Sequence, residues 1–364
     1  MATILSVAEA TPPNKIWQEE ATDFARELFG PAYKDINRLL AAFKNGKIEK
    51  RHFIKELEWY KEKRSFSEKN DCFIEAAVEL GIKAIQACLG NPEYVKRKVQ
   101  YEDIDAIFTI CTTGLSTPSI EARIMNILPF SPHTKRIPIW GLGCAGGASG
   151  LSRAYEYCLA FPKAMVLVLS IELCSLTFQH NDLSKSNLIG TGLFADGVAC
   201  TLIAGSEAKV KEYTKKQAIP KVVGTQSALM QNSLDVMGWD IRDEGLYVVF
   251  SKDIPTIVKK WLRPQVESFL SKYRVTMDQI DQFIAHPGGK KVLEAFGEAL
   301  TLKPEKLVPS FEVLKEYGNM SSVTIFYVLN RIMKQELTPE QWGLAVALGP
   351  GFSSELLLLR WGEV

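Results

Sequence analysis

Short apolar runs separated by polar segments recur along the whole chain. The runs at residues 1–9, 164–173 and 343–348 are rich in aliphatic residues and have the length of buried strands. Residues 73–88 and 253–273 instead carry apolar positions at helical spacing and predict amphipathic helices. Strands that alternate with helices in this way predict an α/β fold.

The order of the predicted elements repeats along the chain. A helix and an apolar strand lead to Cys111 in the first part, and the same order leads to His286 in the second. Further on, Cys144 and Asn319 each precede a predicted helix and then an apolar strand, at a separation of about 175 residues. The repeat includes the short segments before these two residues, which we take as corresponding strands: 136–140 and 307–311.

This repeat predicts two similar α/β halves, residues 1–215 and 216–364, joined near the polar, Lys-rich stretch 206–220. If a pseudo-twofold axis relates the halves, Cys144 and Asn319 occupy equivalent helix N-termini. Two such N-termini can face each other across the axis.

Composition places the chain among ordinary folded proteins. Of its 364 residues, 46% are hydrophobic and 23% are charged, with 43 Lys plus Arg against 42 Asp plus Glu. The net charge of +1 gives no electrostatic reason to expect nucleic acid or an acidic membrane surface as a partner. No stretch approaches ~18 uninterrupted apolar residues, so we expect no membrane span.

The cysteines and histidines give no sign of a metal site. Seven Cys without C-x-x-C spacing do not suggest a disulfide framework or bound zinc, and reduced thiols in the cytoplasm are the expected state. Four His without metal-ligand spacing give metal catalysis little support. Residues 1–9 lack the features of a signal peptide, so we expect a cytoplasmic protein.

Cys144 stands in Gly141-Leu142-Gly143-Cys144-Ala145-Gly146-Gly147, between an apolar stretch and a predicted helix. The glycines allow backbones to approach closely, and the N–H groups at the helix start should favour a thiolate and lower the pKa of the Cys. Cys144 is therefore a candidate nucleophile whose neighbouring amides could stabilise an oxyanion. The alternative is a buried structural Cys, the interpretation we keep for the other six.

The glycines around Cys144 also match a second pattern. Gly141, Gly143 and Gly146 fit G-x-G-x-x-G, the dinucleotide-binding fingerprint. The next apolar strand, however, ends near Glu172, about 30 residues on, whereas the ribose-binding acid should lie ~20 residues on. A Cys also has no role in binding pyrophosphate, so the loop favours a nucleophile over NAD.

Two polar residues are candidate partners of this Cys. His286 follows an apolar strand and precedes Pro287-Gly288-Gly289, which places its imidazole at the carboxyl end of a strand, where sites of α/β proteins form. Asn319 by itself is typical of a helix N-cap. Its correspondence to Cys144 in the repeat makes it a candidate site residue.

Together these motifs resemble the type III polyketide synthases, the chalcone-synthase-like branch of the thiolase fold. The matching segments span most of the chain in the expected order: residues 111–114, 143–147, 192–197, 285–289, 317–322 and 349–352. The similarity is greatest to bacterial members that make alkylpyrones or alkylresorcinols. It implies a thiolase-like αβαβα fold and a homodimer.

The resemblance implies a Cys–His–Asn triad of Cys144, His286 and Asn319. Cys144 would take an acyl group from acyl-CoA as a thioester, and His286 and Asn319 would stabilise the enolate left when malonyl-CoA loses its carboxylate. The enolate would attack the acyl thioester, and after two or three rounds the chain would cyclise. Coenzyme A thioesters are then substrates, and no metal or redox cofactor is expected.

The resemblance also implies substrate-binding residues. Phe194 matches a gatekeeping Phe, Thr177 matches a cavity-lining Thr, and Thr117 matches a position that reaches into the partner's cavity across a dimer. Val248 replaces a second gatekeeping Phe, and because this leaves more space we expect a long fatty acyl starter. The remaining expected substrate contacts lie around one loop: Leu348, Gly349 and Gly351.

The family's coenzyme A site uses basic residues of an N-terminal helix. Here Arg38 alone falls in register, because Ala41 and Asn45 replace the others. The expected coenzyme A contacts are Arg38, Lys44, Gly289 and Lys291.

Three other functions remain open. A ketoacyl synthase III-like enzyme would perform a single condensation with an acyl carrier protein, although the residues after His286 differ from that group's usual sequence. A non-catalytic acyl-binding scaffold would use the same fold without chemistry. A Cys-dependent hydrolase would release a free acid and ignore malonyl-CoA.

Overall fold

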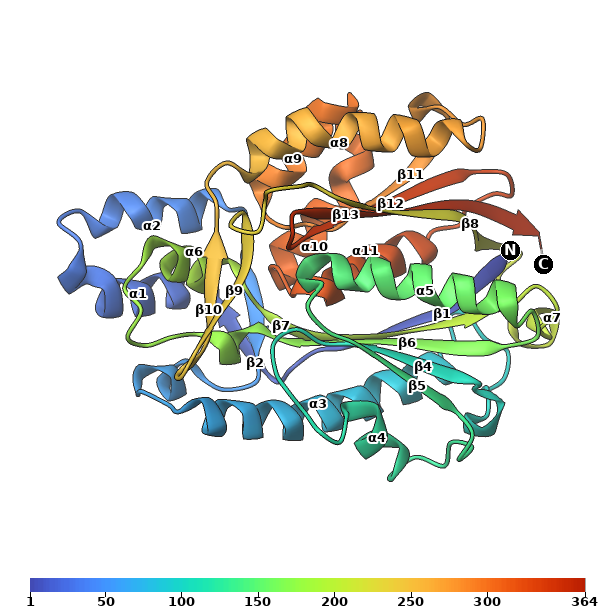
Figure 1. Cartoon of the computed structure of the whole chain (residues 1–364), viewed down its shortest axis with the longest axis horizontal. Coiled ribbons are helices and arrows are strands. Elements are labelled where there is room, and N and C mark those ends of the chain that lie inside the picture. The colour runs from blue at the N-terminus through green and yellow to red at the C-terminus, as the bar shows by residue number, and fades with distance from the viewer. Residues whose placement is uncertain (364) are drawn as a thin grey trace.

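The computed structural model describes residues 1–363, and their helices and strands form five layers in the order α, β, α, β, α (Figure 1). Each β layer is one half of a mixed sheet, and one layer of helices lies between the two halves. The layering agrees with the αβαβα arrangement expected from the sequence. The division of the chain at residues 215 and 216 stays a prediction.

Within residues 1–363 the main sheet has nine strands, which we give by half. The N-terminal half holds, in spatial order, β1 (Ala2–Ala10), β7 (Asp196–Ala204), β6 (Met165–Leu173), β4 (Ala106–Ile110) and β5 (Lys135–Ile139). The C-terminal half holds β8 (Ala218–Leu229), β13 (Ser353–Glu363), β12 (Trp342–Gly349) and β11 (Ile280–Ala285). The halves join where β1 meets β8 over Ala2↔Val222 and Thr3↔Lys221.

The strand neighbours of the two halves correspond. In the first half β4 runs parallel to β6, which pairs antiparallel with β7; in the second half β11 runs parallel to β12, which pairs antiparallel with β13. Two further pairs of strands stand apart from the main sheet: β2 (Asn14–Trp17) with β3 (Lys50–Phe53), and β9 (Met237–Arg242) with β10 (Gly245–Phe250).

Helices cover both outer faces and fill the middle layer (Figure 1). The outer helices are α3 (Phe66–Leu89) and α4 (Ile120–Met125) on one side and α8 (Ile254–Ser271) and α9 (Lys290–Leu300) on the other. The inner helices are α5 (Gly146–Ala160), α10 (Val308–Tyr317) and α11 (Thr324–Met333). The remaining helices are α1 (Gln18–Phe29), α2 (Ile36–Asn45), α6 (Lys185–Leu193) and α7 (Val210–Tyr213).

The segment 307–311 is the one place where the predicted repeat is wrong. Residues 136–139 lie in β5, as expected, but Val308 begins helix α10. Pro309 explains the difference, because its ring fixes a φ that suits the first turn of a helix. Pro138 is tolerated in β5 because β5 is the edge strand of its half.

Local sequence accounts for the longest helix. Ser65 caps α3 by accepting a hydrogen bond from the Glu68 N–H, and the Glu68 carboxylate accepts one from the Ser65 N–H. This capping box satisfies two backbone donors at the helix start. Buried positions from Phe73 to Leu89 then pack against the strands of the first half.

The inner helices approach each other where glycine replaces a side chain. A Cβ on Gly147 of α5 would lie 2.1 Å from the carbonyl oxygen of Ser322, just before α11. A Cβ on Gly150 would lie 2.5 Å from Ile110, at the end of strand β4, so α5 also packs closely on the sheet. The Gly146-Gly147 pair thus lets the start of α5 contact the segment before α11 directly. This contact brings the regions of Cys144 and Asn319 together.

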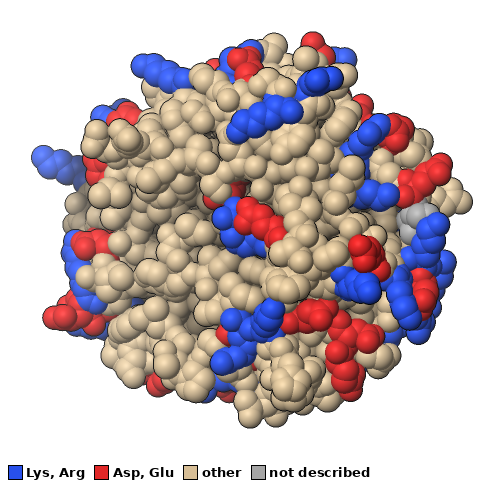
Figure 2. Space-filling view, turned by 45° about the vertical axis from the view of Figure 1, so that its right-hand side comes forward, with Lys and Arg blue, Asp and Glu red and all other residues tan. Residues whose placement is uncertain are grey.

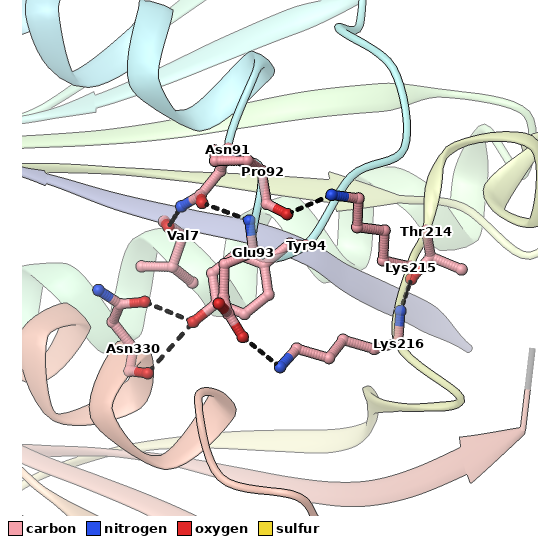
Figure 3. Close-up of polar contacts among 9 residues, drawn as sticks. All are labelled: Val7, Asn91, Pro92, Glu93, Tyr94, Thr214, Lys215, Lys216 and Asn330. Atoms are coloured by element: carbon pink, nitrogen blue, oxygen red, sulfur yellow. Dashed lines mark hydrogen bonds and ion pairs between the residues drawn. The ribbon is translucent and has the colours of Figure 1, made fainter.

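Charged residues of the stretch 206–220 tie it to the first half. Lys216 forms an ion pair with Glu93 (2.6 Å), and Lys215 donates to the carbonyl oxygen of Pro92 (Figure 3). Beside them, the Tyr94 hydroxyl donates to the Asn330 side chain on α11. The polar stretch is therefore a folded connection, which includes α7 and leads into β8.

Acidic and basic side chains are intermixed over the face of the molecule seen in Figure 2. This distribution agrees with the near-zero net charge of the chain. Within the described part of the chain, none of the helices has the combination of length and apolarity that a bilayer crossing requires.

The close contact at Gly147 generates a prediction. Gly147→Ala should lower the free energy of unfolding by about 1–3 kcal/mol, because the new methyl group meets a backbone oxygen that cannot move freely. Thermal unfolding measures the change. Gly30→Ala is the matched control, because Gly30 has an ordinary helical φ of −51° and open space around its Cα. Equal melting temperatures for both variants would contradict the prediction.

Candidate active site

Cys144 lies in a 3-10 turn, Gly143–Ala145, that runs directly into α5. Gly143 has a φ of +46°, and a Cβ there would lie 2.7 Å from the Pro350 ring. A Cβ on Gly349 would lie 2.6 Å from the Leu142 oxygen. The loop after β12 is therefore packed against the turn that holds Cys144, and the glycines on both sides permit this contact.

Asn319 is held by its backbone on both sides. Its N–H donates to the Leu193 oxygen (3.0 Å), and its carbonyl oxygen accepts from the Ala195 N–H (2.9 Å). Its side-chain oxygen accepts from the Ser321 N–H at 2.8 Å, which is the N-cap-like contact expected of Asn at a helix start. The Nδ2 group points toward the Gly288 oxygen at 3.4 Å, so the amide donor faces the loop of His286.

His286 follows β11, where its N–H donates to the Val346 oxygen of the neighbouring strand. The residue is 3% exposed, and neither Nδ1 nor Nε2 has a hydrogen-bond partner among residues 1–363. A buried imidazole without partners is costly. The two unused nitrogens therefore mark His286 as a candidate reactive residue.

The expected pKa of Cys144 is wrong in direction. Burial raises the pKa of the Cys144 thiol to about 11, although the nearby Ser321 and Asn319 side chains lower it. Burial also lowers the pKa of His286 to about 3. The loss of solvation outweighs the effect of the helix N-terminus, so the Cys144 thiol and the His286 imidazole both favour their neutral forms.

The sequence interpretation missed a buried carboxyl group beside this site. Glu172, on β6, is fully buried and accepts hydrogen bonds from the side chains of Thr112, Thr113 and Ser322. Burial raises the pKa of Glu172 to about 7, and its charge contributes to the raised pKa of Cys144. The sequence does contain a signal for this group, because Glu172 is an acidic residue in the otherwise apolar strand 165–173. From the pattern alone, Glu172 was interpreted only as the end of that strand.

An apolar pocket lies beside these residues. Three of the expected substrate contacts line it: Phe194, Thr177 and Val248. Phe194 stacks on Phe250 of β10 at 5.4 Å and bridges to Asn319 through the backbone, so it stands between the pocket and the Cys144 region. The far wall of the pocket comes from α1, with Ala21 and Phe24.

The other expected substrate contacts lie elsewhere. Leu348 is 4% exposed and packs in the core of the C-terminal half, because β12 is covered on both faces; it does not line the pocket. Gly349 and Gly351 flank Pro350 in the loop against the Cys144 turn. Thr117 is exposed and does not reach the pocket of its own chain.

The expected coenzyme A contacts lie at the surface. Arg38 and Lys44 are exposed on α2, and Lys291 is exposed on α9. Gly289 has a φ of +144° and forms the N-cap of α9. Among residues 1–363, no group of three or more His, Cys, Asp or Glu is arranged to hold a metal ion.

Comparison with known proteins agrees with this arrangement. The family model for the N-terminal domain of chalcone and stilbene synthases matches residues 1–208, and the model for their C-terminal domain matches residues 221–361. The chain therefore belongs to the chalcone and stilbene synthase family, and it is a type III polyketide synthase, an enzyme of the acyltransferase class. Members of this family condense malonyl-CoA units iteratively.

Individual relatives cover nearly the whole chain. A putative chalcone synthase from Bacillus subtilis is 53% identical over 99% of both chains. A 1,3,6,8-tetrahydroxynaphthalene synthase from Streptomyces peucetius is 32% identical over 99% of this chain and 93% of its own. The crystal structure of the enzyme of that name from Streptomyces coelicolor, a bacterial type III polyketide synthase, superposes with a TM-score of 0.92 at 26% identity over 100% of both chains. The expected thiolase-like fold is thereby confirmed.

The buried state of His286 generates a pH prediction. A pKa of about 3 in the folded protein means that only the unfolded chain binds a proton at this residue as the pH falls below 6.5. His286 therefore contributes stability above pH 6.5 that is lost on acidification. Relative to His286→Gln, the free energy of unfolding of the unmodified protein should fall by about 2 kcal/mol between pH 8 and pH 5.

Denaturant unfolding of both proteins at several pH values measures this difference. Glu172 titrates in the opposite direction, because its raised pKa gives stability that is lost as the pH rises toward 7. It is present in both proteins, so its contribution cancels in the comparison. Parallel stability curves for the two proteins would show that His286 is not held neutral by burial.

Proposed function

We propose that this protein condenses malonyl-CoA repeatedly onto a long-chain fatty acyl-CoA starter and cyclises the product to an alkylpyrone, with Cys144, His286 and Asn319 as catalytic residues. One observation carries the proposal. Cys144 and Asn319 lie at two helix starts that contact each other, the Asn319 amide donor points to Gly288 in the loop of the buried, unpaired His286, and Phe194 lines an apolar pocket.

The loading step needs a base for the thiol. Because the site favours neutral groups, His286 acts as general base: it accepts the proton of the Cys144 thiol as sulfur attacks the thioester carbon of the starter. The bond from that carbon to the coenzyme A sulfur breaks, and the departing thiolate takes the proton from His286. The products are an acyl thioester on Cys144 and free coenzyme A.

Chain extension needs an enolate. When malonyl-CoA loses carbon dioxide, the electrons of the broken C–C bond form an enolate on the thioester. The Asn319 Nδ2 group and a protonated ring nitrogen of His286 donate hydrogen bonds to its oxygen, where the charge develops. The enolate carbon then attacks the acyl thioester, which forms the new C–C bond and expels the Cys144 thiolate.

The apolar pocket supports a fatty acyl starter. Its wall combines Phe24, Phe53 and Leu57 with Val248, where a ring would take up space. Apolar walls of this kind favour a hydrocarbon chain over a polar one. After each extension the chain returns from coenzyme A to Cys144 by the same exchange that loads the starter. It would be released when an enol oxygen attacks the thioester carbon, which closes a six-membered lactone and expels the Cys144 thiolate, and this thiolate takes up the enol proton.

Surface groups support the remaining proposals. Arg38, Lys44 and Lys291 are exposed cations that can contact the phosphates of coenzyme A, and the positive φ at Gly289 allows a ligand to approach its backbone. A cytoplasmic location stays a prediction from the sequence.

The central experiment combines malonyl-CoA with acyl-CoA starters of increasing length and identifies the products by mass spectrometry. We expect alkylpyrones from long starters and an acyl adduct on Cys144. Cys144→Ala should remove the adduct and lower product formation by more than about 10³-fold. Cys158→Ala, which removes a buried thiol on α5, the helix that follows Cys144, is the matched control and should keep activity.

Each alternative function has its own outcome in this experiment. A non-alkylated aromatic product from malonyl-CoA alone would overturn the fatty acyl starter. A single condensation that requires an acyl carrier protein would indicate a ketoacyl synthase III-like reaction. Free fatty acid as the only product would indicate a hydrolase, and unchanged Cys144→Ala activity would remove the nucleophile from the proposal.

The role of Val248 can be tested by restoring a ring. Val248→Phe should lower kcat/KM for long acyl-CoA starters at least about tenfold and leave short starters nearly unchanged, because the ring occupies the pocket. Steady-state kinetics with both starter classes measures the change. Val249→Phe is the matched control, because the next residue on β10 points to the opposite face. An equal loss for all starters in Val248→Phe would contradict the assignment.

We also infer a homodimer formed at the edge strand β5. Among the described residues β5 pairs only with β4, and exposed Leu115, Ile127 and Trp140 lie in the segments around it. Thr117, in the same exposed loop as Leu115, is then close to the second chain. Trp140→Arg should shift the mass in sedimentation velocity from two chains to one, whereas Leu234→Arg, 85% exposed in the C-terminal half, should not. A single-chain mass for the unmodified protein would exclude the dimer.

A further inference from the structure

Arg51, on β3, is a cation buried completely inside the protein. Its exposed fraction is 0%, and among residues 1–363 its Nε and Nη2 atoms have no hydrogen-bond partner. Burying a guanidinium costs free energy when some of its donors have no partner, so a burial of this kind calls for a structural or functional reason. Burial lowers the pKa of Arg51 to about 9, with Asp196 acting against this shift, so the side chain is charged at neutral pH.

The partners of Arg51 are two backbone carbonyls next to the active site. Its Nη1 donates to the oxygens of Thr191 and Phe194, both at 2.7 Å. These carbonyls lie at the end of α6, where the chain leaves the helix and enters residues 193–195. One side chain therefore fixes the end of that helix.

Residues 193–195 are the segment that holds Asn319. The Leu193 oxygen accepts from the Asn319 N–H, and the Ala195 N–H donates to the Asn319 oxygen. Phe194 lies between these two contacts, and its own carbonyl is the one bound by Arg51. The backbone position of Asn319 thus depends on the same short segment that Arg51 fixes.

Arg51 also contacts the other side of Asn319. A Cβ on Gly318 would lie 2.8 Å from both Cγ and Cδ of Arg51, and Gly318 has a φ of +70° that favours glycine. The stem of Arg51 therefore packs directly against the residue before Asn319, while its guanidinium binds the segment opposite.

From these contacts we infer that Arg51 is a positioning residue for enolate formation, which sets the place of Asn319 and of the Phe194 ring. This inference rests on the proposed role of Asn319. Cys144 and His286 are held by other segments, the turn before α5 and the end of β11. Loss of the Arg51 contacts should therefore impair decarboxylation and extension much more than the loading of Cys144.

Two variants separate the contributions of charge and shape. Arg51→Met keeps a similar stem but removes every donor, and leaves the Thr191 and Phe194 carbonyls without this partner. Arg51→Lys keeps the charge but not the forked geometry that reaches both oxygens. Lys50→Met, the neighbouring residue on β3 and partly exposed, is the matched control.

The experiment measures two steps on each folded variant. Mass spectrometry of the Cys144 peptide after iodoacetamide treatment counts reactive Cys144 thiols, because the chain has seven free cysteines. Acyl transfer from the starter gives the loading rate, and carbon dioxide release from malonyl-CoA gives the decarboxylation rate. In Arg51→Met we expect decarboxylation to fall about ten- to a hundredfold per active thiol, with loading within about twofold of the unmodified enzyme. The decarboxylation rate of Arg51→Lys should lie between those of Arg51→Met and the unmodified enzyme. Lys50→Met should leave both rates unchanged.

Asn319→Ala separates failure of this inference from failure of the proposed function. If Asn319→Ala loses decarboxylation while Arg51→Met and Arg51→Lys keep it, Arg51 does not position Asn319. If Asn319→Ala itself retains decarboxylation, the proposed role of Asn319 is wrong. Equal losses of loading and decarboxylation in the Arg51 variants would show a general structural role and would overturn the inference. If Arg51→Met does not fold, Arg51→Lys alone decides the outcome by the same ratio of rates.

Discussion

The contact between the start of α5 and the segment before α11 determines where every other part of the site lies. Gly147 makes this contact possible, since any side chain there would meet the Ser322 oxygen. The two helices come from different halves of the chain, so their meeting aligns the two α/β halves as well as the ends of the helices. Cys144 on one side and Asn319 on the other are close neighbours as a direct result.

Burial is the second constraint, and it follows from the first. The helix starts meet in the middle layer of five, and the groups at the site lose much of their solvation there, so the Cys144 thiol and the His286 imidazole both favour their neutral forms. The same loss of solvation raises the pKa of the Glu172 carboxyl to about 7. A site of this kind holds little charge before a substrate binds, and charge that develops during a reaction is then stabilised by fixed donors instead of water.

One residue, Phe194, connects the apolar pocket to the candidate triad. The ring of Phe194 lines the pocket, and its backbone belongs to the segment that holds Asn319. Arg51 donates a hydrogen bond to the Phe194 carbonyl oxygen. The shape of the pocket and the position of the Asn319 amide therefore depend on the same short segment. A change in the shape of the pocket is expected to move the Asn319 amide as well. This gives a physical reason why starter choice and chain extension can vary together in such a site.

The sequence by itself determined most strands and helices of the repeat, the two similar halves, the family and the three residues of the candidate triad. These features depend on periodicity and on short motifs, which local residues specify. The tertiary structure alone decided that residues 307–311 are helical, that Leu348 lies in the core, and that the pKa of Cys144 is raised instead of lowered. It also revealed Glu172 and Arg51 beside the site. The reason is that solvation and hydrogen-bond partners are set by segments far apart in the chain, and no local pattern records which of them will meet.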